Sequence, residues 1–317
     1  VNDYRVALPH GNKVFHTNML KKYFERSNDS DCDNDRIEVV AAGLSVVDDA
    51  DEPTGEPLIH TLDSSSQSWQ DVNINPDLPL ALRRPLVELV KEFSSIFSDI
   101  PGRTTTHEHK IELIDDQPIR VKQYPIPYAI RDEAVKAVQE MLDQGIIEPS
   151  DSPFCSPLLM VRKKDSTYRP VIDFRALNQK TVFDAEPTPN VDDIHVKLAG
   201  SHFFSKMDFC KGYWQIAMRP SDKPKTAFQC PPLGLFAFCT MPFGLVNSMA
   251  TYSRMMRKVL EGLLSTDNFV DDVLTYTVSW QDHLDELRRV FQRVKQAGLT
   301  IKPSKCYFGY DTIDFVG

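Results

Sequence analysis

The sequence has few of the residues that build covalent or metal-stapled frameworks. Its six cysteines are spread over 317 residues, with no CxxC pair and no spacing typical of zinc ligands. Scattered thiols of this kind are more often buried apolar residues than bridges. The composition therefore excludes a disulfide-rich secreted scaffold and a zinc-finger protein.

Long hydrophobic runs are also absent from the sequence. No stretch of about 18 apolar residues occurs, so no transmembrane helix is expected. No signal peptide is recognisable either. We therefore expect a protein with no membrane partner, which works in the cytoplasm or the nucleus and is not secreted.

Positive charge is scarce, and this bears on whether the chain can bind nucleic acid. The formal net charge is −9, but its distribution is uneven. Residues 27–117 hold twenty acidic and six basic residues, whereas residues 118–317 hold 23 acidic and 25 basic residues. The second part is therefore near neutral, and it can bind nucleic acid if its basic residues line one groove.

Two apolar segments that run into aspartates are the most informative feature present. Residues 203–208 (FFSKMD) end in Asp208, and residues 269–272 (FVDD) end in Asp271 and Asp272. Each pattern places a carboxylate at a strand end, and the second has the form of a tight hairpin. Side by side, such carboxylates suit a pair of Mg²⁺ ions that catalyse phosphoryl transfer. The alternative is an ordinary solvated loop charge, which we expect for the other Asp-Asp pairs of the sequence.

The hydrophobic pattern predicts helices and strands that alternate irregularly. Such a pattern is typical of an α+β fold with an antiparallel sheet. Gly145 is the predicted stop of one helix. His107 and His109 alternate on a strand without a cysteine partner nearby, so we expect them at the surface and not at a metal. The predicted helices are residues 80–97, 131–144, 247–264 and 280–297, and the predicted strands are 109–113, 158–161 and 171–174.

Composition divides the chain into four segments. Residues 1–26 are expected to contain a small hairpin. Residues 27–76 are rich in Asp, Ser, Pro and Glu, which predicts a disordered acidic linker. Residues 77–117 are predicted to supply a helix and a strand that lead into residues 118–317, where the informative motifs lie.

Five segments of the chain together resemble the motifs of one enzyme family. Their sequence, order and spacing are similar to the fingers and palm of reverse transcriptases, and above all to the gypsy/Ty3 group of long-terminal-repeat retrotransposons. The resemblance covers residues 118–317. It implies the right-hand polymerase fold, with fingers and an antiparallel palm sheet packed on helices. The segments are residues 169–178 (RPVIDFRALN), 208–216 (DFCKGYWQI), 241–248 (MPFGLVNS), 269–272 (FVDD) and 298–306 (GLTIKPSKC).

The resemblance implies a catalytic centre built on three carboxylates. Asp208, Asp271 and Asp272 would be the catalytic residues and the metal ligands, with Asp208 and Asp271 the better candidates for direct ligation. Two Mg²⁺ ions, for which Mn²⁺ can substitute, would activate a primer 3′-hydroxyl and neutralise the leaving pyrophosphate. The backbone carbonyl of Phe209 would be a further ligand beside the dNTP.

The resemblance also implies a dNTP pocket. Tyr213 matches the steric gate, whose ring would clash with a ribose 2′-hydroxyl. Phe243 matches a residue that lines the pocket. Lys163 would meet the γ-phosphate and Arg169 would lie across the base, both from a hairpin that closes over the nucleotide. Without the resemblance, Tyr213 is an ordinary core aromatic and the Lys163 turn a solvated hairpin tip.

Template and primer contacts are expected on both sides of this pocket. Arg175 resembles the template-side arginine of the family. Lys305 or Lys302 is a candidate general acid toward pyrophosphate, although either can equally be a surface lysine near phosphate. The opening of the primer grip is matched by Phe315, Val316 and Gly317. Because the chain stops there, we expect a module truncated at the primer grip, without thumb, connection or RNase H, that holds a duplex poorly.

Residues 16–23 (HTNMLKKY) resemble the C-terminal end of some retroelement integrases. This likeness links residues 1–26 to DNA integration and the chain to a Pol polyprotein.

The leading hypothesis is an RNA-directed DNA polymerase module, which uses dNTPs and a primed RNA or DNA template in a cytoplasmic virus-like particle or the nucleus. The alternative is a truncated, non-catalytic retroelement remnant that at most binds nucleic acid. A Mg²⁺ nuclease that uses the same carboxylates would leave Tyr213 and Lys163 without a role.

Overall fold

The structure, a computed structural model, describes residues 67–163, 166–187, 196–269 and 272–314, and the backbone of two strands near the N-terminus. The chain divides into two compact units, residues 1–56 and 57–317. In the first unit, β1 (Asp3–Leu8) pairs antiparallel with β2 (Gly11–His16). The hairpin predicted within residues 1–26 is therefore confirmed.

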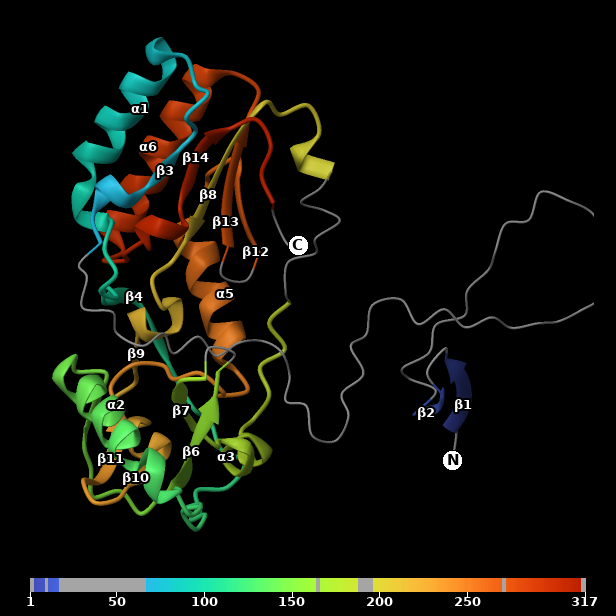
Figure 1. The fold of residues 1–317 in the computed structure, drawn as a ribbon, viewed down its shortest axis with the longest axis vertical. Helices are drawn as coiled ribbons and strands as arrows, with labels where there is room; N and C mark the ends of the chain where they lie inside the picture. The colour runs from blue at the N-terminus through green and yellow to red at the C-terminus, as the bar shows by residue number, and fades with distance from the viewer. Residues whose placement is uncertain are drawn as a thin grey trace, which may run out of the picture. The chain divides into compact units, whose positions relative to one another are not determined.

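A five-stranded sheet in the second unit carries the candidate carboxylates. Its strand order is β12-β13-β8-β14-β3, and all neighbours pair antiparallel except β14 and β3, which pair parallel (Figure 1). The predicted antiparallel palm sheet is thus confirmed, with one short parallel addition at its edge. The strands are β12 (Thr266–Phe269), β13 (Asp272–Thr277), β8 (Phe203–Asp208), β14 (Tyr307–Tyr310) and β3 (Asn73–Ile74).

Two amphipathic helices pack beside this sheet, and both were predicted from the sequence. α6 (Trp280–Gln296) contacts β13, and α1 (Leu80–Glu92) packs on α6 (Figure 1). The apolar residues of α6 recur at helical spacing, so one face is buried and the other is charged. Phe291 of α6 lies at the centre, because its ring contacts those of Phe93, Phe97 and Phe308. This aromatic cluster fixes the helices against the sheet.

A second five-stranded sheet forms the other end of the unit. Its order is β5-β11-β10-β6-β7, and α2 (Arg131–Asp143) packs against it through Ala134, Val138 and Met141. The helix ends just before Gly145, as predicted, and this part corresponds to the expected fingers. The strands are β5 (Ile147–Pro149), β11 (Gly234–Phe238), β10 (Phe228–Cys230), β6 (Ser156–Arg162) and β7 (Tyr168–Ile172).

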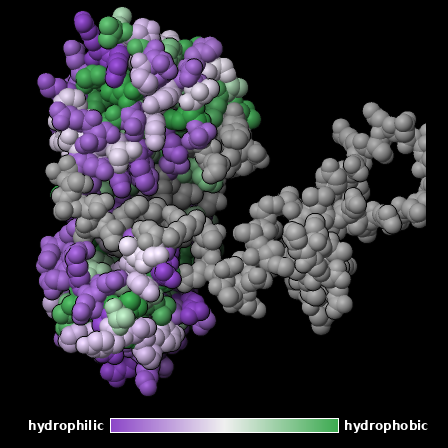
Figure 2. Space-filling model, viewed as in Figure 1, coloured by the Kyte–Doolittle hydropathy of each residue, from purple (hydrophilic) through white to green (hydrophobic). Residues whose placement is uncertain are grey.

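Short elements join the two sheets. α3 (Arg175–Lys180) follows β7, and α5 (Ser248–Val259) packs on β4 (Thr104–His109), which pairs parallel with β9 (Ile216–Met218). Buried residues from both sheets and these helices belong to one hydrophobic cluster. Figure 2 shows that hydrophilic residues cover most of the visible described face, with hydrophobic ones in scattered patches. Among the described helices, none is long and apolar enough to cross a membrane.

The N-terminal part of the second unit corrects two predictions. Residues 67–76, assigned to a disordered linker, are structured where they meet the sheet. Strand β3 pairs with β14, and the Asn73 and Asn75 side chains donate hydrogen bonds to backbone carbonyls of residues 304–309. The following strand is Thr104–His109 and not residues 109–113. Long-range pairing with a distant segment explains both errors, because local composition does not report it.

His109 is also not at the surface, as the sequence had suggested. Its side chain is 1% exposed, and its Nδ1 lies 2.8 Å from Thr251 Oγ1 of α5. Burial lowers the pKa of His109 to about 4, and it does the same for His283, which bridges Ser205 and Thr277. Both imidazoles are therefore neutral in the folded protein at neutral pH.

We expect stability to fall as the pH drops below 6.5. The folded-state pKa of each histidine lies below the unfolded value, so the unfolded chain binds protons more readily and stability is lost toward pH 4. Between pH 7 and 5.5 the loss should be about 1 kcal/mol for each histidine. Urea unfolding of the parent and of His283→Asn at both pH values checks this. An unchanged pH dependence in the variant would contradict the assignment.

Gly298, two residues after the end of α6, occupies a position that only glycine fits without strain. Its φ is +70°, and an added Cβ would lie 2.6 Å from the carbonyl oxygen of Arg103. Gly298→Ala should therefore lower the free energy of unfolding by about 3 kcal/mol, through left-handed backbone strain and overpacking. Gly262→Ala is the matched control, since φ is +80° but nothing lies within 4 Å of its Cβ. Equal losses in the two variants would show that the close contact has no effect.

Candidate active site

Two of the predicted carboxylates face each other at the end of the palm sheet. Asp208 is the last residue of β8 and Asp272 the first of β13, and the register of the two strands places them directly opposite. Their side chains are 21% and 27% exposed, so both reach solvent from the sheet edge. The third predicted carboxylate, Asp271, lies outside the described residues. The expectation of two adjacent Asp-ended strands is therefore confirmed for Asp208 and Asp272.

The local sequence explains why the carboxylates lie at a strand end. β12 and β13 pair antiparallel with Phe269 opposite Asp272, so only residues 270–271 separate the two strands. This is the two-residue spacing of a tight hairpin. Buried Val273 and Leu274 anchor the strand immediately after Asp272. The apolar residues thus hold the strand in the core while the acidic residue stays at the tip.

Two lysines balance the charge of this pair. Lys305 Nζ lies 3.1 Å from Asp208 Oδ2, and Lys206 Nζ lies 2.8 Å from Asp272 Oδ2. Burial raises the pKa of Asp208, and Lys305 acts in the opposite direction. The sequence had singled out Lys305 but missed Lys206. The available signal was its position two residues before Asp208, which puts both side chains on one face of β8.

The backbone of Phe209 forms a bridge whose hydrogen bonds do not use its carbonyl. Phe209 bridges Ile301, and the hydrogen bonds of that bridge run from Cys210 N to Thr300 O and from Lys302 N to Asp208 O. Because the bridge uses only the flanking groups, the carbonyl of Phe209 points away from it. Of the two candidate lysines, Lys302 donates its backbone amide to Asp208 O, and Lys305 donates its side-chain Nζ to Asp208 Oδ2 at 3.1 Å.

The donor set of the centre fits hard divalent cations. Asp208, Asp272 and the Phe209 carbonyl are oxygen donors, which suit Mg²⁺ better than zinc or copper. Within the part of the chain that the structure describes, no three His, Cys, Asp or Glu side chains are grouped closely enough to hold a metal. The described residues thus offer oxygen donors of the kind that hard divalent cations prefer.

The predicted steric gate lies in an aromatic stack. The ring of Tyr213 is stacked on Phe243 with 5.1 Å between centroids, and it is tilted against Tyr252 at 5.5 Å. Trp214 also contacts Phe243. Tyr213 and Phe243 are half-buried, whereas Tyr252 is fully buried. The structure thus brings together two aromatics that the sequence had assigned separately to the dNTP pocket.

The hairpin predicted to close over the nucleotide is present. β6 and β7 pair antiparallel with Val161 opposite Arg169, and Lys163 N donates to Thr167 O at 2.7 Å across the turn. β6 is longer than predicted at both ends, whereas β7 begins three residues earlier than predicted and stops at Ile172, two residues before the predicted end. Lys163 and Arg169 are both half-buried. Their geometry fits a two-stranded arm with its basic residues near the tip.

Arg175 is held by its own neighbour. Its Nε and Nη2 donate to the two carboxylate oxygens of Asp173 at 2.9 and 2.8 Å, and this contact lowers the pKa of Asp173. The arginine side chain is 79% exposed, so the bidentate pair orients it toward solvent. Its template-side role stays a prediction. Three further predicted residues, Phe315, Val316 and Gly317, lie outside the described part of the chain.

Three amide side chains that the sequence analysis missed hold the motifs together. Gln215 is fully buried and bonds both Cys210 and Thr300, which joins the segments 208–216 and 298–306. Asn178 bonds the loop 244–246 that precedes α5, and Asn247 bonds the segment 182–184. Each residue lies inside a segment that the family resemblance quoted. Only long-range contacts reveal what the amides do.

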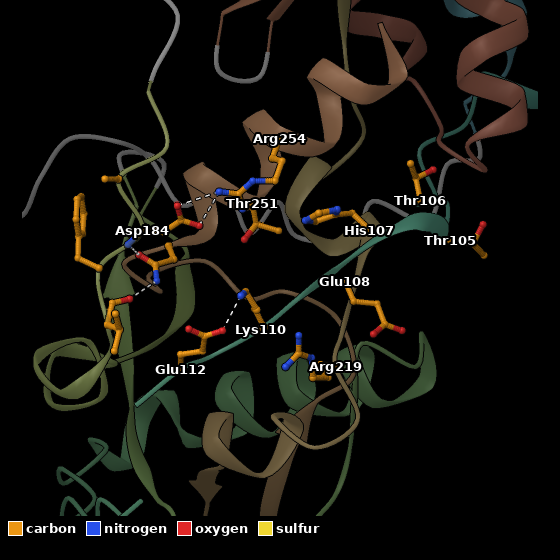
Figure 3. Close-up of a pocket in the computed structure, with 14 residues that line it drawn as sticks. Thr105, Thr106, His107, Glu108, Lys110, Glu112, Asp184, Arg219, Thr251 and Arg254 are labelled. Carbon is orange, nitrogen blue, oxygen red and sulfur yellow. Dashed lines mark hydrogen bonds and ion pairs between the residues drawn. The ribbon is translucent and has the colours of Figure 1, made fainter. Parts of the chain in front are cut away.

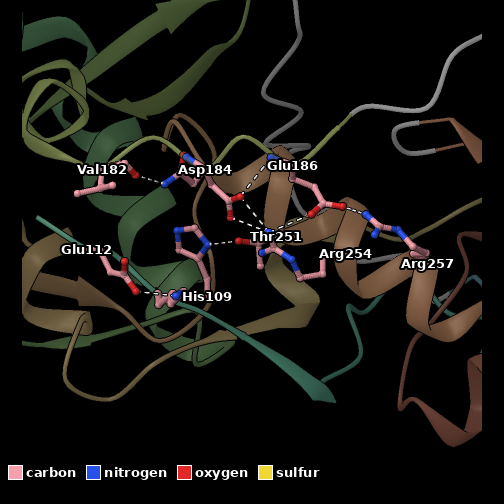
Figure 4. Close-up of polar contacts among 10 residues, drawn as sticks. His109, Glu112, Val182, Asp184, Glu186, Thr251, Arg254 and Arg257 are labelled. Carbon is pink, nitrogen blue, oxygen red and sulfur yellow. Dashed lines mark hydrogen bonds and ion pairs between the residues drawn. The ribbon is translucent and has the colours of Figure 1, made fainter.

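A pocket of about 740 Å³ lies beside α5, apart from the predicted site (Figure 3). Its walls mix charges of both signs, among them Glu108 and Lys110 of the β4 region. Arg254 and Asp184 of the pocket wall form an ion pair. Arg254 also bonds Glu186, which pairs in turn with Arg257 (Figure 4). These ion pairs fasten residues 184–186 to α5. None of the residues that line the pocket is among the predicted catalytic or dNTP-binding residues.

Comparison with known proteins identifies the chain. Residues 161–317 match the family described as reverse transcriptase (RNA-dependent DNA polymerase). They form a reverse transcriptase domain. The matched range contains Asp208 and Asp272, which the structure places opposite each other, and it contains Tyr213 and Phe243, which are stacked. The predicted family is thereby confirmed.

The relatives of this reverse transcriptase domain are polyproteins. The chain is 38% identical over 221 residues to the retrovirus-related Pol polyprotein from transposon 297 of Drosophila melanogaster, which covers 68% of this chain and 21% of that protein. It is 38% identical over 225 residues to the enzymatic polyprotein of Cestrum yellow leaf curling virus, covering 68% of this chain and 34% of that one. The Pol polyprotein from transposon gypsy of Drosophila melanogaster is 29% identical over 286 residues, covering 86% and 27%. The chain thus spans 21 to 34% of the length of these relatives.

Solved reverse transcriptases share the fold. The foamy viral protease-reverse transcriptase in complex with an RNA/DNA hybrid matches with a TM-score of 0.70 at 21% identity, covering 76% of this chain and 33% of that one. The native Prototype Foamy Virus protease-reverse transcriptase matches with a TM-score of 0.68 at 24% identity, covering 75% and 32%. At this identity the likeness shows the fold alone. It confirms the predicted α+β architecture of fingers and palm.

Proposed function

We propose that this chain is the polymerase module of a retrotransposon Pol polyprotein, an RNA-directed DNA polymerase that transfers a nucleotide from a dNTP to a primer 3′-hydroxyl. The observation that carries the proposal is Asp208 opposite Asp272 on adjacent strands, inside a reverse transcriptase domain. The proposed partners are a primed RNA or DNA template and dNTPs. Related foamy viral enzymes in complex with an RNA/DNA hybrid and with double-stranded DNA support this choice.

The proposed cofactors are two Mg²⁺ ions, which Mn²⁺ can replace. Asp208, Asp271 and Asp272 would hold them, with the carbonyl of Phe209 as a further oxygen donor. Bound divalent ions lower the pKa of a primer hydroxyl and neutralise charge on the leaving pyrophosphate. Lys305, which lies 3.1 Å from Asp208, would donate a proton to that pyrophosphate.

The chain itself binds and orients the nucleotide. Lys163 and Arg169, on the β6–β7 hairpin, would contact the triphosphate and the base. Tyr213 would exclude the ribose 2′-hydroxyl, with Phe243 stacked behind it. Holding the two reactants in line can supply several kcal/mol of the barrier, about 7 or more in well-oriented cases. The dNTP pocket therefore depends on how rigidly these side chains are supported.

The remaining contacts extend along the duplex and the polyprotein. Arg175 is the proposed template contact, and Phe315, Val316 and Gly317 are the proposed start of the primer grip. Residues 1–26 are proposed as the end of an integrase, which would place DNA integration in the same polyprotein. We place the work of the module in cytoplasmic virus-like particles or the nucleus.

Extension of a DNA primer on an RNA template by the purified chain, with Mg²⁺ or Mn²⁺, tests this proposal. We expect metal-dependent addition of dNTPs that stops when the metal is chelated. Tight binding of the primed template without extension under any metal condition would favour a non-catalytic remnant. Cleavage of a labelled duplex in the absence of dNTPs would point instead to a nuclease.

A further inference from the structure

Asn178 of α3 uses both the amide nitrogen and the oxygen of its side chain to bond the loop that precedes α5. Asn178 Nδ2 donates to the carbonyl of Gly244 at 2.8 Å, and Asn178 Oδ1 accepts from the amide of Val246 at 2.9 Å. Two hydrogen bonds from one planar group to residues two apart imitate a strand pairing. They fix the position and the orientation of the loop together.

The loop is held both by the core and by amide side chains. Leu245 is buried in the hydrophobic core, whereas Gly244 is exposed with φ +88°, a backbone conformation that glycine adopts without strain. On its far side the Asn247 carboxamide makes a similar pair of bonds, accepting from Asp184 N at 3.0 Å and donating to Val182 O at 2.8 Å. The loop is therefore fastened by amide side chains on both sides, and Asn178 supplies the fastening nearest to Phe243.

Phe243 transmits this restraint to the predicted gate. It precedes Gly244 directly, and its ring is stacked on Tyr213 at 5.1 Å with only 28° between the planes. The buried ring of Tyr252 backs Tyr213 from another side at 5.5 Å. A shift of the loop would thus move one wall that holds Tyr213. A side chain that rejects a substrate by steric clash is selective only if its neighbours prevent it from moving aside.

We propose that Asn178 is a specificity-determining residue, which holds the 244–246 loop so that Phe243 keeps Tyr213 rigid against ribonucleoside triphosphates. The inference rests on the proposed polymerase function and deepens it. Asn178 is a positioning residue, since it acts through Phe243 and Tyr213. Its two hydrogen bonds each contribute about 1 kcal/mol. Loss of one of them should therefore change the selectivity between deoxynucleotides and ribonucleotides measurably, while the centre at Asp208 stays unchanged.

The test compares kcat and KM for one dNTP and for the matching ribonucleotide in the parent and in Asn178→Ala. The ratio of the two kcat/KM values should fall about tenfold, the equivalent of one of the two bonds. We expect a higher KM for the dNTP with kcat within about twofold of the parent, the signature of weakened binding. The matched control is Gln179→Ala, because Gln179 is the next residue of α3 and is exposed.

A second variant tests the inference if Asn178→Ala does not fold. Asn178→Asp preserves the shape and the acceptor for Val246, but it cannot donate to the carbonyl of Gly244. It should lose selectivity as Asn178→Ala does. If the parent extends primers and both variants keep its selectivity, the inference is wrong while the polymerase function stands. If the parent extends nothing, the proposed function fails and takes the inference with it.

Discussion

Asp208→Asn should reduce primer extension by about 10³-fold, the upper end of what one preorganised electrostatic group supplies. The amide has the shape of the carboxylate, so the strand pairing of β8 with β13 should survive. What changes is the charge, because a neutral amide holds divalent cations poorly and leaves Lys305 without its partner at 3.1 Å. The measurement is single-turnover extension of a DNA primer on an RNA template at saturating Mg²⁺.

Asp267→Asn is the matched control for this change. Asp267 lies on β12 of the same sheet, is 23% exposed and pairs with Lys197 at 2.7 Å, so its loss removes a comparable ion pair. We expect its activity to stay within about twofold of the parent, because Asp267 lies opposite Leu274, away from the tip where Asp208 and Asp272 pair, and bonds Tyr276 Oη at 2.6 Å instead. Binding of the primed template should be the same in both variants. Undiminished extension by Asp208→Asn would show that the chemistry does not use this carboxylate.

The second large effect is expected at Tyr213. Tyr213→Val should raise the acceptance of ribonucleotides relative to deoxynucleotides by about 10²-fold, the scale at which pocket shape discriminates between small substrate differences. Removal of the ring opens the space beside Phe243, where the 2′-hydroxyl is expected to lie. The measurement is the ratio of kcat/KM for the two nucleotides.

Tyr213→Phe separates the ring from its hydroxyl. Selection by clash depends on the ring, so this variant should keep the selectivity of the parent. A loss of selectivity as large as that of Tyr213→Val would mean that a hydrogen bond of the hydroxyl does the selecting. The tenfold effect expected for Asn178→Ala is smaller, because Asn178 acts through two intervening side chains.

The catalytic strands could be predicted because their signals are local. An apolar run that ends in Asp208, and a two-residue interruption between β12 and β13, report strand ends directly. The helices that bury one face, such as α2 with its stop before Gly145, are predictable for the same reason. Residue patterns alone leave open whether Tyr213 is a core aromatic or a steric gate. The family motifs predicted the gate.

Long-range contacts account for what the sequence missed. Gln215 bonds Thr300, 85 residues away, and the Asn178 carboxamide bonds Gly244 and Val246 at separations of 66 and 68. His109 was expected at the surface because no cysteine partner lies near it in the sequence, yet packing of β4 on α5 buries it. Composition alone cannot show such pairings, since each partner is ordinary in its own segment.

The most direct test of the account is single-nucleotide incorporation by the purified chain on a primed RNA template, with each of the four dNTPs offered alone in Mg²⁺. We expect addition of the dNTP complementary to the next template base, and loss of that addition in Asp208→Asn but not in Asp267→Asn. Addition that ignores the template base, or that persists in Asp208→Asn, would contradict templated synthesis at the carboxylates of β8 and β13.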